Sequence, residues 1–180
     1  MKFNYSWLMH GVTIYSATES VDSRGYFRKI LTPPNIALSA PSKIEEVFYS
    51  QTKTGGIRGL HVQIGPAANF RFIHVSEGEI FDVLIDLRRE SESFGQKLET
   101  HLSSLNPKVL VVPPGVAHGF QALSNATIMY LTTSSHSLEF DTGIHWDSIE
   151  VKWPIPVTEV SERDNNLPHL AKWLSGELHV

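Results

Sequence analysis

Two histidines stand in stretches whose neighbouring residues would fix the position of an imidazole. His61 lies in the run Arg58-Gly59-Leu60-His61-Val62-Gln63, shortly after a Gly-Gly pair that lets the backbone turn or approach something closely. His118 follows the apolar pair Val111-Val112 and the stiff turn Pro113-Pro114-Gly115. An imidazole exchanges a proton near ambient pH and can act as a general base or acid. Two such segments on one β-rich chain predict a pocket with two histidines.

Each histidine also has a structural interpretation. His61 could be a strand-end histidine held in the core by one hydrogen bond, and His118 could follow a hairpin turn without a role. If residues 57–63 form a strand, their side chains alternate between two faces. His61 and Gln63 would then point into whatever the sheet encloses, together with Ile57 and Gly59. The other face would carry Arg58, Leu60 and Val62.

The composition predicts one cytoplasmic domain. The chain has 180 residues, enough for a single domain with a sizeable core, which we place at 1–180. It has no cysteine, which excludes a disulfide framework and a thiolate nucleophile. The first residues lack the apolar core of a signal peptide, and no run is long enough to span a membrane. With a net charge of −4 and no basic cluster, a nucleic-acid polymer is not an expected partner.

The elements that must position the histidines are short strands separated by turn signals. Runs of β-branched and aromatic residues predict strands at residues 11–16, 26–31, 46–51, 57–63, 70–75, 79–87, 98–102, 108–112, 120–123 and 127–133. Residues 36–42 fit a helical turn or a loop. Only Leu167 to Leu178 has apolar residues at helical spacing. Strands about ten residues apart predict an all-β sandwich or barrel with a short C-terminal helix.

An ordered set of motifs resembles the dTDP-4-dehydrorhamnose 3,5-epimerase family over roughly residues 10 to 170. The set comprises Asp22-x-Arg24-Gly25-x-Phe27, Arg58-Gly59-Leu60-His61-x-Gln63, Gly78-Glu79-Ile80-Phe81-Asp82-Val83, Asp86-Leu87-Arg88, Ser91/Ser93-Phe94-Gly95, Pro113-Pro114-Gly115-x-Ala117-His118-Gly119-Phe120, Tyr130, Trp146-Asp147, Trp153-Pro154 and Ser161-x-x-Asp164. The resemblance implies a cupin-type jelly roll, with the site inside the barrel, and a homodimer whose N-terminal strands cross over.

The resemblance also implies the reaction and the roles of residues. The reaction is epimerisation at C3, C5 or both of a 4-keto-6-deoxy sugar on a nucleotide diphosphate, most simply a dTDP-sugar, without metal or cofactor. His61 matches the base, Asp164 the carboxylate that orients it, and Tyr130 the acid on the opposite sugar face. Arg71 and His118 match residues near the C4 oxygen. The substrate-binding residues would be Arg24, Phe27, Arg58, Gln63 and Arg163.

The chain departs from the family pattern at several positions. Arg71 stands where the family usually has lysine, which keeps the charge but replaces a point charge with a planar fork. Ser134-Ser135-His136-Ser137 replaces a usual Tyr-Tyr pair, Arg28-Lys29 lacks a usual acid, and Glu46-Val47-Phe48 replaces a usual Gln-x-Asn. The resemblance therefore implies that the catalytic residues are retained and that the residues recognising the base and the sugar are changed. It implies a protein that acts on another 4-keto-deoxy sugar nucleotide.

Two other functions stay open at this point. Pro113 to His118 also matches half of a metal-dependent cupin signature, but His61-Val62-Gln63 supplies one histidine where that signature has two. The second alternative is a sugar-nucleotide-binding protein without catalysis, favoured by the changes at Arg71 and Ser135. Tyr130 and Asp164 each have ordinary interpretations as well, a packed aromatic and a turn residue.

Overall fold

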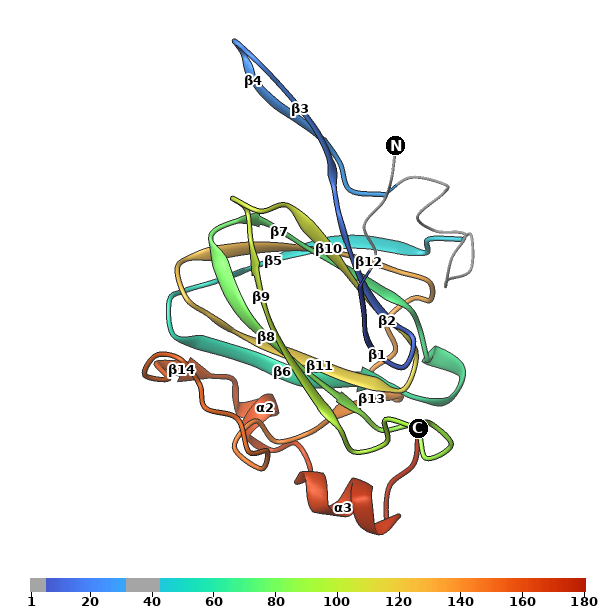
Figure 1. Cartoon of the computed structure of the whole chain (residues 1–180). Coiled ribbons are helices and arrows are strands. Elements are labelled where there is room, and N and C mark those ends of the chain that lie inside the picture. Colours follow the sequence, from blue (N-terminus) through green and yellow to red (C-terminus); the bar gives the residue numbers. More distant parts are fainter. Residues whose placement is uncertain (1–5, 32–42) are drawn as a thin grey trace.

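Two mainly antiparallel sheets face each other in the computed structural model, which describes residues 6–31 and 43–180 (Figure 1). The first sheet has the order β1 (Ser6–Met9), β2 (Val12–Ser16), β10 (Lys108–Val112), β7 (Arg71–Glu77), β12 (Ala126–Thr132) and β5 (Glu46–Thr52). The second has the order β13 (Asp141–Gly143), β6 (Gly56–Gln63), β11 (Val116–Ala122), β8 (Glu79–Asp86) and β9 (Lys97–Ser103). The short β14 (Glu159–Val160) pairs with β6 in parallel. The predicted all-β jelly-roll barrel is confirmed.

The core lies between the two sheets and follows from the alternation of side chains along each strand. In β12, buried and partly buried residues alternate, so Ile128 and Tyr130 point inward. They join Ile73 of β7 and, from the facing sheet, Leu84 and Phe120 in one buried cluster. Burial of such side chains contributes about 25 cal/mol per Å² of apolar surface removed from water. The same alternation places polar residues of these strands inside the barrel.

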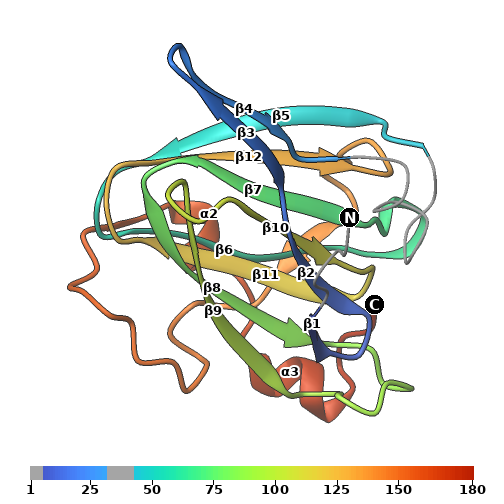
Figure 2. The same cartoon turned by 45° about the horizontal axis from the view of Figure 1, so that its top comes forward.

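The outer face of the second sheet is also buried, because the C-terminal part of the chain packs against it. Phe81, Val83 and Ile85 of β8 form an outer cluster with Trp173. Trp173 lies on α3 (Leu170–Ser175), and α2 (Glu162–Asn165) lies nearer to β6 (Figures 1 and 2). The C-terminal segment thus covers β6 from outside and brings its own residues close to that strand.

The C-terminal helix is shorter than the sequence pattern predicts. Helix α3 begins after His169, which follows Pro168, and its last residue is Ser175, followed by Gly176 in the left-handed conformation with φ of 89°. Proline and glycine in these places mark helix ends, and they limit the helix to six of the predicted residues. The only other helical pieces in residues 6–31 and 43–180 are α2 and the 3-10 turn η1 (Gly65–Ala67). No helix in these ranges is long and apolar enough to cross a membrane.

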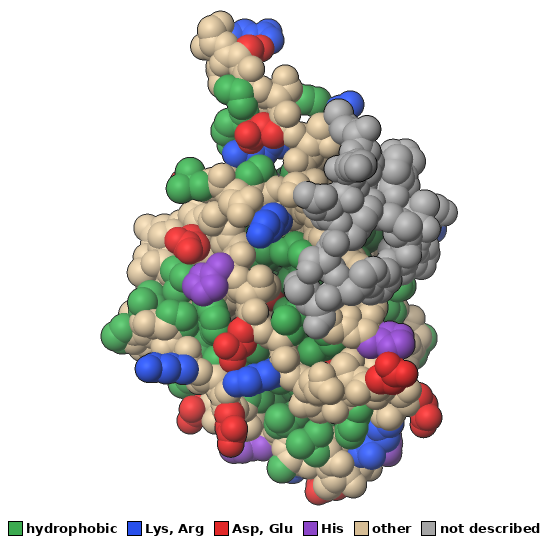
Figure 3. Space-filling model, in the orientation of Figure 1, with side chains coloured by type: hydrophobic (Ala, Val, Ile, Leu, Met, Phe, Trp, Pro, Cys, Tyr) green, Lys and Arg blue, Asp and Glu red, His purple; other side chains and the backbone are tan. Residues whose placement is uncertain are grey.

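A hairpin of β3 (Thr18–Asp22) and β4 (Gly25–Lys29) projects from the body of the molecule (Figures 1 and 3). Its side chains are largely exposed, including Val21 at 70%, Tyr26 at 61% and Phe27 at 63%. The hairpin pairs with no other strand among the described residues. The turn or loop predicted at 36–42 lies outside the described residues.

A bulge in β6 corrects the predicted alternation. His61 pairs with His118 of β11 and Arg58 pairs with Phe120, so two residues of β6 face the single Gly119. A β-bulge of this kind changes the phase of the side chains along the strand. Arg58 and His61, which simple alternation places on opposite faces, therefore both line the interior of the barrel.

Candidate active site

A cavity of about 280 Å³ lies between the two sheets. Its walls come from β5, β7 and β12 on one side and from β6, β11 and β13 on the other. It brings together most of the predicted site residues: Arg58, His61, Gln63, Arg71, His118, Tyr130 and Arg163. Asp164 is a direct partner of His61, whereas Arg24 and Phe27 do not line the cavity.

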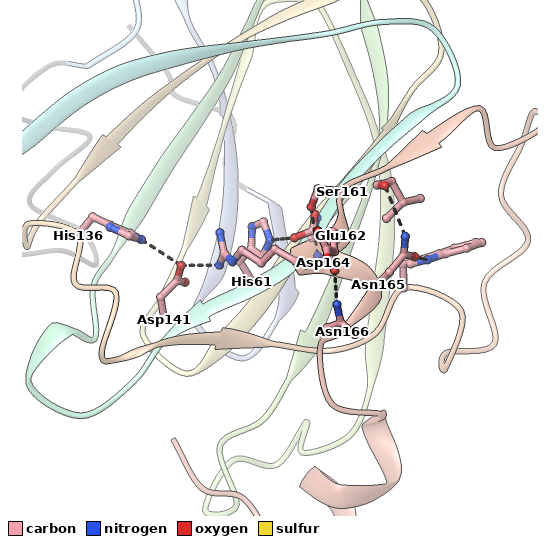
Figure 4. A network of polar contacts seen from close by, with 12 residues as sticks. His61, His136, Asp141, Ser161, Glu162, Asp164, Asn165 and Asn166 are labelled. Atoms are coloured by element: carbon pink, nitrogen blue, oxygen red, sulfur yellow. Dashed lines mark hydrogen bonds and ion pairs between the residues drawn. The ribbon is translucent and has the colours of Figure 1, made fainter.

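His61 and Asp164 form a hydrogen-bonded pair at the wall of the cavity (Figure 4). Nε2 of His61 lies 2.7 Å from Oδ1 of Asp164, and Oδ2 accepts the backbone N–H of Gly59 at 2.9 Å. Ser161 caps α2 by accepting the backbone N–H of Asp164, which fixes the carboxylate. The Ser-x-x-Asp pattern is thus both a helix cap and half of this pair.

The pKa of Asp164 is lowered from its ordinary value. Burial acts to raise it, but the hydrogen bond and charge of His61, the Gly59 N–H and the charge of Arg163 outweigh burial. The carboxylate is ionised at neutral pH and only accepts hydrogen bonds, so the Nε2 of a neutral His61 carries the proton. Nδ1 is then the basic nitrogen of His61.

A second histidine–carboxylate pair lies beside the first. Nε2 of His118 is 2.7 Å from Oδ2 of Asp82, and both side chains are buried. Burial raises the pKa of Asp82, while His118 and Arg71 act to lower it. Sequence analysis did not assign Asp82 a role. The available signal was one charged residue inside the apolar run of β8, on the face opposite to Phe81 and Val83.

Tyr130 faces the histidines from the other sheet. Its ring lies 6.4 Å from the His118 ring in an edge-on arrangement and stacks on Phe48 of β5 at 5.0 Å. Burial raises the pKa of Tyr130 above its ordinary value. Its phenol is therefore protonated at neutral pH and can serve as a proton donor.

Arg71 enters the cavity from β7 and holds the two histidine strands. Its Nη1 donates to the carbonyl of His61 at 3.0 Å, and its Nη2 donates to the carbonyl of Val116 at 2.7 Å. Burial lowers the pKa of Arg71 to about 10, and the nearby Tyr130, Asp141 and Asp82 oppose that shift. The guanidinium stays charged at neutral pH and keeps further N–H donors for an anion.

The predicted substrate-binding residues that line the cavity are tied to neighbours. Arg58 donates to the Thr52 hydroxyl and the Gln51 carbonyl. Gln63 exchanges two hydrogen bonds with the backbone of Ser137, at 3.0 and 3.2 Å. Arg163 is paired with Asp141.

Arg24 and Phe27 lie on the projecting hairpin. Arg24 is paired there with Asp22, which raises the pKa of Arg24. Within one chain the structure does not bring these two residues to the cavity, and their predicted role stays a prediction. Among the described residues, no group of three or more His, Asp or Glu side chains is placed to hold a metal ion.

Sequence analysis assigned no role to His136 and Asp141, which form a polar group on the cavity wall with the predicted Arg163. His136 donates to Asp141 over 3.0 Å, and Arg163 reaches the same carboxylate oxygen. Asp141 itself lies on β13, where it pairs with Gln63. No spacing rule joins residues 136, 141 and 163, since they meet only after β13 and α2 pack along β6.

The comparisons with known proteins agree on one family. The model of the dTDP-4-dehydrorhamnose 3,5-epimerase family matches residues 7–172. A dTDP-4-dehydrorhamnose 3,5-epimerase of Shigella flexneri is 34% identical over 160 residues, which cover 86% of this chain and 88% of the relative. One from Methanothermobacter thermautotrophicus is 34% identical over 168 residues, covering 88% of this chain and 89% of the relative.

Two solved structures of such enzymes superpose on nearly the whole chain. The dTDP-4-dehydrorhamnose 3,5-epimerase of Sulfolobus tokodaii has a TM-score of 0.89 at 30% identity, covering 96% of this chain and 97% of its own. A dTDP-6-deoxy-D-glucose-3,5-epimerase of Legionella pneumophila, solved in complex with dTDP-4-keto-L-rhamnose, has a TM-score of 0.88 at 27% identity, covering 94% of both chains.

Proposed function

The chain belongs to the dTDP-4-dehydrorhamnose 3,5-epimerase family, and on this premise we propose that it is an epimerase of a nucleotide-linked 4-keto-6-deoxy sugar. We propose His61 as the base, with Asp164 orienting it, and Tyr130 as the acid. The observation that carries these roles is the imidazole–carboxylate pair of β6 and α2, which shares one cavity with a phenol of the opposite sheet.

The reaction needs one proton removed and one returned. Nδ1 of His61 takes the proton from the carbon beside the C4 ketone, and the C–H electrons move to the C4 oxygen as an enolate. Asp164 stabilises the imidazolium that forms. The Tyr130 phenol then delivers a proton to the same carbon from the opposite face, which inverts the centre. His61 and the Tyr130 phenolate return to their starting forms by proton exchange with water.

The enolate oxygen needs fixed donors, which are usually the largest electrostatic contribution to such a step. Arg71 is charged, and only two of its N–H groups are used by backbone carbonyls. His118, held by Asp82, lies on the strand next to His61. These contacts support Arg71 and His118 as the groups that bind the C4 oxygen. Arg58, Gln63 and Arg163 line the same cavity and are proposed for the rest of the substrate.

Arg24 and Phe27 require a second copy of the chain, which we include in the proposal as a homodimer. The hairpin that carries them stands clear of its own cavity and exposes Val21, Tyr26 and Phe27. A mixture of Arg24→Ala and His61→Ala chains tests this arrangement. If hairpins are exchanged, mixed dimers contain one intact site and regain activity that neither variant has alone; a mixture that stays inactive contradicts it.

Solvent deuterium exchange tests the function directly. In D₂O the enzyme should place deuterium at C3, C5 or both of a dTDP-4-keto-6-deoxyglucose probe, as read by NMR and mass spectrometry. His61→Asn should abolish exchange, whereas His101→Gln, an exposed histidine paired with Glu79 away from the cavity, should not change it. Absence of exchange across a panel of 4-keto-6-deoxy sugar nucleotides would contradict catalysis and favour a binding role.

A further inference from the structure

Strand β5 lies beside β12, the strand that carries Tyr130 (Figure 2). Phe48 is directly opposite Tyr130 in the antiparallel register, and Ser50 is opposite Ile128, two residues away. Residues that are opposite each other in such a pair point to the same face of the sheet. Because Ile128 and Tyr130 point inward, Phe48 and Ser50 do so too, and both line the cavity.

Two aromatic contacts fix the ring of Tyr130. The Phe48 ring stacks on it, with the centroids 5.0 Å apart and the planes 14° from parallel. His118 of the facing sheet meets the same ring edge-on, with a centroid distance of 6.4 Å. Stacked and edge-on pairs of this kind are favourable beyond the area they bury. They restrict the orientations open to the Tyr130 ring and so direct its phenol.

The hydroxyl of Ser50 is a buried polar group that makes no hydrogen bond of ordinary geometry within the described ranges. Leaving such a group without a partner costs folding free energy, so its presence calls for an explanation. Burial raises the pKa of Tyr130, and the Ser50 hydroxyl acts to lower it. The hydroxyl therefore interacts more favourably with a Tyr130 phenolate than with the neutral phenol.

Two arginines near the phenol favour the same ionised state. Arg58 and Arg71 act to lower the pKa of Tyr130, whereas Asp82 acts to raise it. Arg58 is itself bound to β5 through two hydrogen bonds. Strand β5 thus holds both a cation and a hydroxyl that stabilise negative charge on the atom from which Tyr130 gives up its proton.

We propose that β5 positions the acid of the reaction, with Phe48 holding the Tyr130 ring and the Ser50 hydroxyl donating a hydrogen bond to the Tyr130 phenolate. This inference rests on the proposed function, because the phenolate forms only when Tyr130 delivers its proton to the sugar carbon. Ser50 keeps its own proton throughout. Its hydroxyl has no partner before the step and gains a charge-assisted one during it, which lowers the barrier of inversion alone.

The Ser50→Ala variant measures the hydrogen bond to the phenolate. Inversion should slow by roughly ten- to a hundredfold, the worth of a hydrogen bond to a charged group. Deuterium exchange with retention needs only His61 and should stay within about twofold of wild type. The affinity for dTDP-glucose, whose C4 hydroxyl prevents turnover, should also stay within about twofold, since a transition-state contact leaves ground-state binding unchanged. Ser50→Thr keeps the hydroxyl and should restore most of the inversion rate.

A double-mutant cycle and urea unfolding separate this role from a structural one. Tyr130→Phe forms no phenolate, so adding Ser50→Ala to it should not slow inversion further. Ser50→Ala alone should unfold at the urea concentration of wild type or a higher one, because the lost hydroxyl was unbonded. The control Ser76→Ala, which removes a hydroxyl bonded to the Thr127 carbonyl, should unfold at a lower concentration and leave inversion unchanged.

The Phe48→Leu variant removes the stacked ring and keeps an apolar side chain. The ratio of inversion to exchange should fall by roughly two- to tenfold, the worth of one aromatic pair. Tyr49→Leu is the matched control, since Tyr49 is the next residue of β5 and is 71% exposed. It should leave the ratio unchanged. Chiral analysis of the deuterated sugar measures the ratio in both variants.

Several outcomes would overturn the inference while the proposed function stands. They are an unchanged inversion rate in Ser50→Ala, an equal loss of exchange and inversion, and an equal further loss in the Tyr130→Phe background. Weaker binding of dTDP-glucose by Ser50→Ala would make Ser50 a ligand contact instead, and an unchanged ratio in Phe48→Leu would remove the role of the stacked ring. If the wild type exchanges no proton of any 4-keto-6-deoxy sugar nucleotide, the proposed function fails instead.

Discussion

Nε2 of His61 lies 2.7 Å from Oδ1 of Asp164, although the two residues are 103 positions apart in the sequence. The other oxygen of the same carboxylate accepts the N–H of Gly59, two residues before His61 on β6. Asp164 is therefore bound to the ring and to the strand that carries the ring. This arrangement fixes the tautomer of a neutral His61 and directs its basicity to Nδ1.

The Asp164→Asn variant tests what the negative charge of this carboxylate contributes. The amide oxygen can still accept from Gly59, but the imidazolium of His61 loses its anionic partner. We expect the deuterium-exchange rate to fall by roughly 10²- to 10⁴-fold, with dTDP-glucose affinity within a few-fold of wild type. NMR of samples quenched at successive times measures the exchange rate, and titration calorimetry measures the affinity for dTDP-glucose. Asp147→Asn, at an exposed position, is the control, and an undiminished rate in Asp164→Asn contradicts the assignment.

The same carboxylate makes stability depend on acid pH. The pKa of Asp164 is lowered in the folded state, so its contribution to stability is present above the unfolded value of about 4 and is lost as pH falls through the folded value. The difference in unfolding free energy between wild type and Asp164→Asn should shrink as pH falls below about 4. Urea unfolding at a series of pH values measures it. A difference that is constant with pH would show that Asp164 titrates alike in both states.

Tyr130→Phe separates proton removal from proton return. Without the phenol, His61 still abstracts the proton and returns solvent deuterium to the same face. We expect exchange with retention to persist, while inversion slows by roughly 10²-fold. Chiral analysis of the labelled sugar gives the ratio of inversion to exchange. Tyr49→Phe, on the neighbouring strand and 71% exposed, should leave that ratio unchanged. An unchanged ratio in Tyr130→Phe as well would exclude Tyr130 as the acid.

The sequence was sufficient for those features that depend on local patterns. Turn signals between short β-prone runs predicted the longer strands of both sheets, but not the short β1, β3, β13 and β14. In β8 the alternate residues Phe81, Val83 and Ile85 share the face that meets Trp173. The resemblance of ordered motifs to a known family supplied the pairing of His61 with Asp164. Spacing alone could not, because that contact depends on how α2 packs along β6.

The remaining features arise from tertiary packing. The bulge that turns Arg58 and His61 to the same side depends on the register between β6 and β11, which the sequence of β6 alone does not specify. Asp82 looked like an isolated charge on a strand until β11 placed His118 against it. His136, Asp141 and Arg163 come from three separate segments. Helix α3 was predicted too long because the prediction followed the apolar spacing and ignored Pro168, which lies just before the helix, and Gly176, which lies just after it.

Two variants of Arg71 separate the contribution of its positive charge from that of its planar guanidinium group. Arg71→Met should lower the exchange rate by roughly 10²- to 10³-fold, since one preorganised donor to the enolate oxygen is lost. Arg71→Lys keeps the charge but cannot donate to the carbonyls of both His61 and Val116 with the same fork, so an intermediate rate is expected. Steady-state exchange rates with several 4-keto-6-deoxy sugars provide the readout. A wild-type rate in Arg71→Met contradicts the role.

Gly59 is the position where β6 and β11 come too close for a side chain. Its φ is +111°, and a Cβ there would lie 2.6 Å from Cα of Gly119 and 2.7 Å from the carbonyl oxygen of His118. Gly25 has a similar φ of +130°, but a Cβ at that position meets nothing within 4 Å. The two glycines therefore share the backbone strain that alanine would introduce and differ in the steric clash.

We expect Gly59→Ala to lower the unfolding free energy by about 3 kcal/mol or more and Gly25→Ala by about 1 kcal/mol. Urea unfolding of both variants gives the difference, which isolates the clash between the strands that carry His61 and His118. Gly59→Ala should also lose exchange activity under conditions where it is folded, because its strands must move apart. Equal destabilisation of the two variants would mean that the strands can separate at little cost, and that the spacing of the two histidines is not set at Gly59.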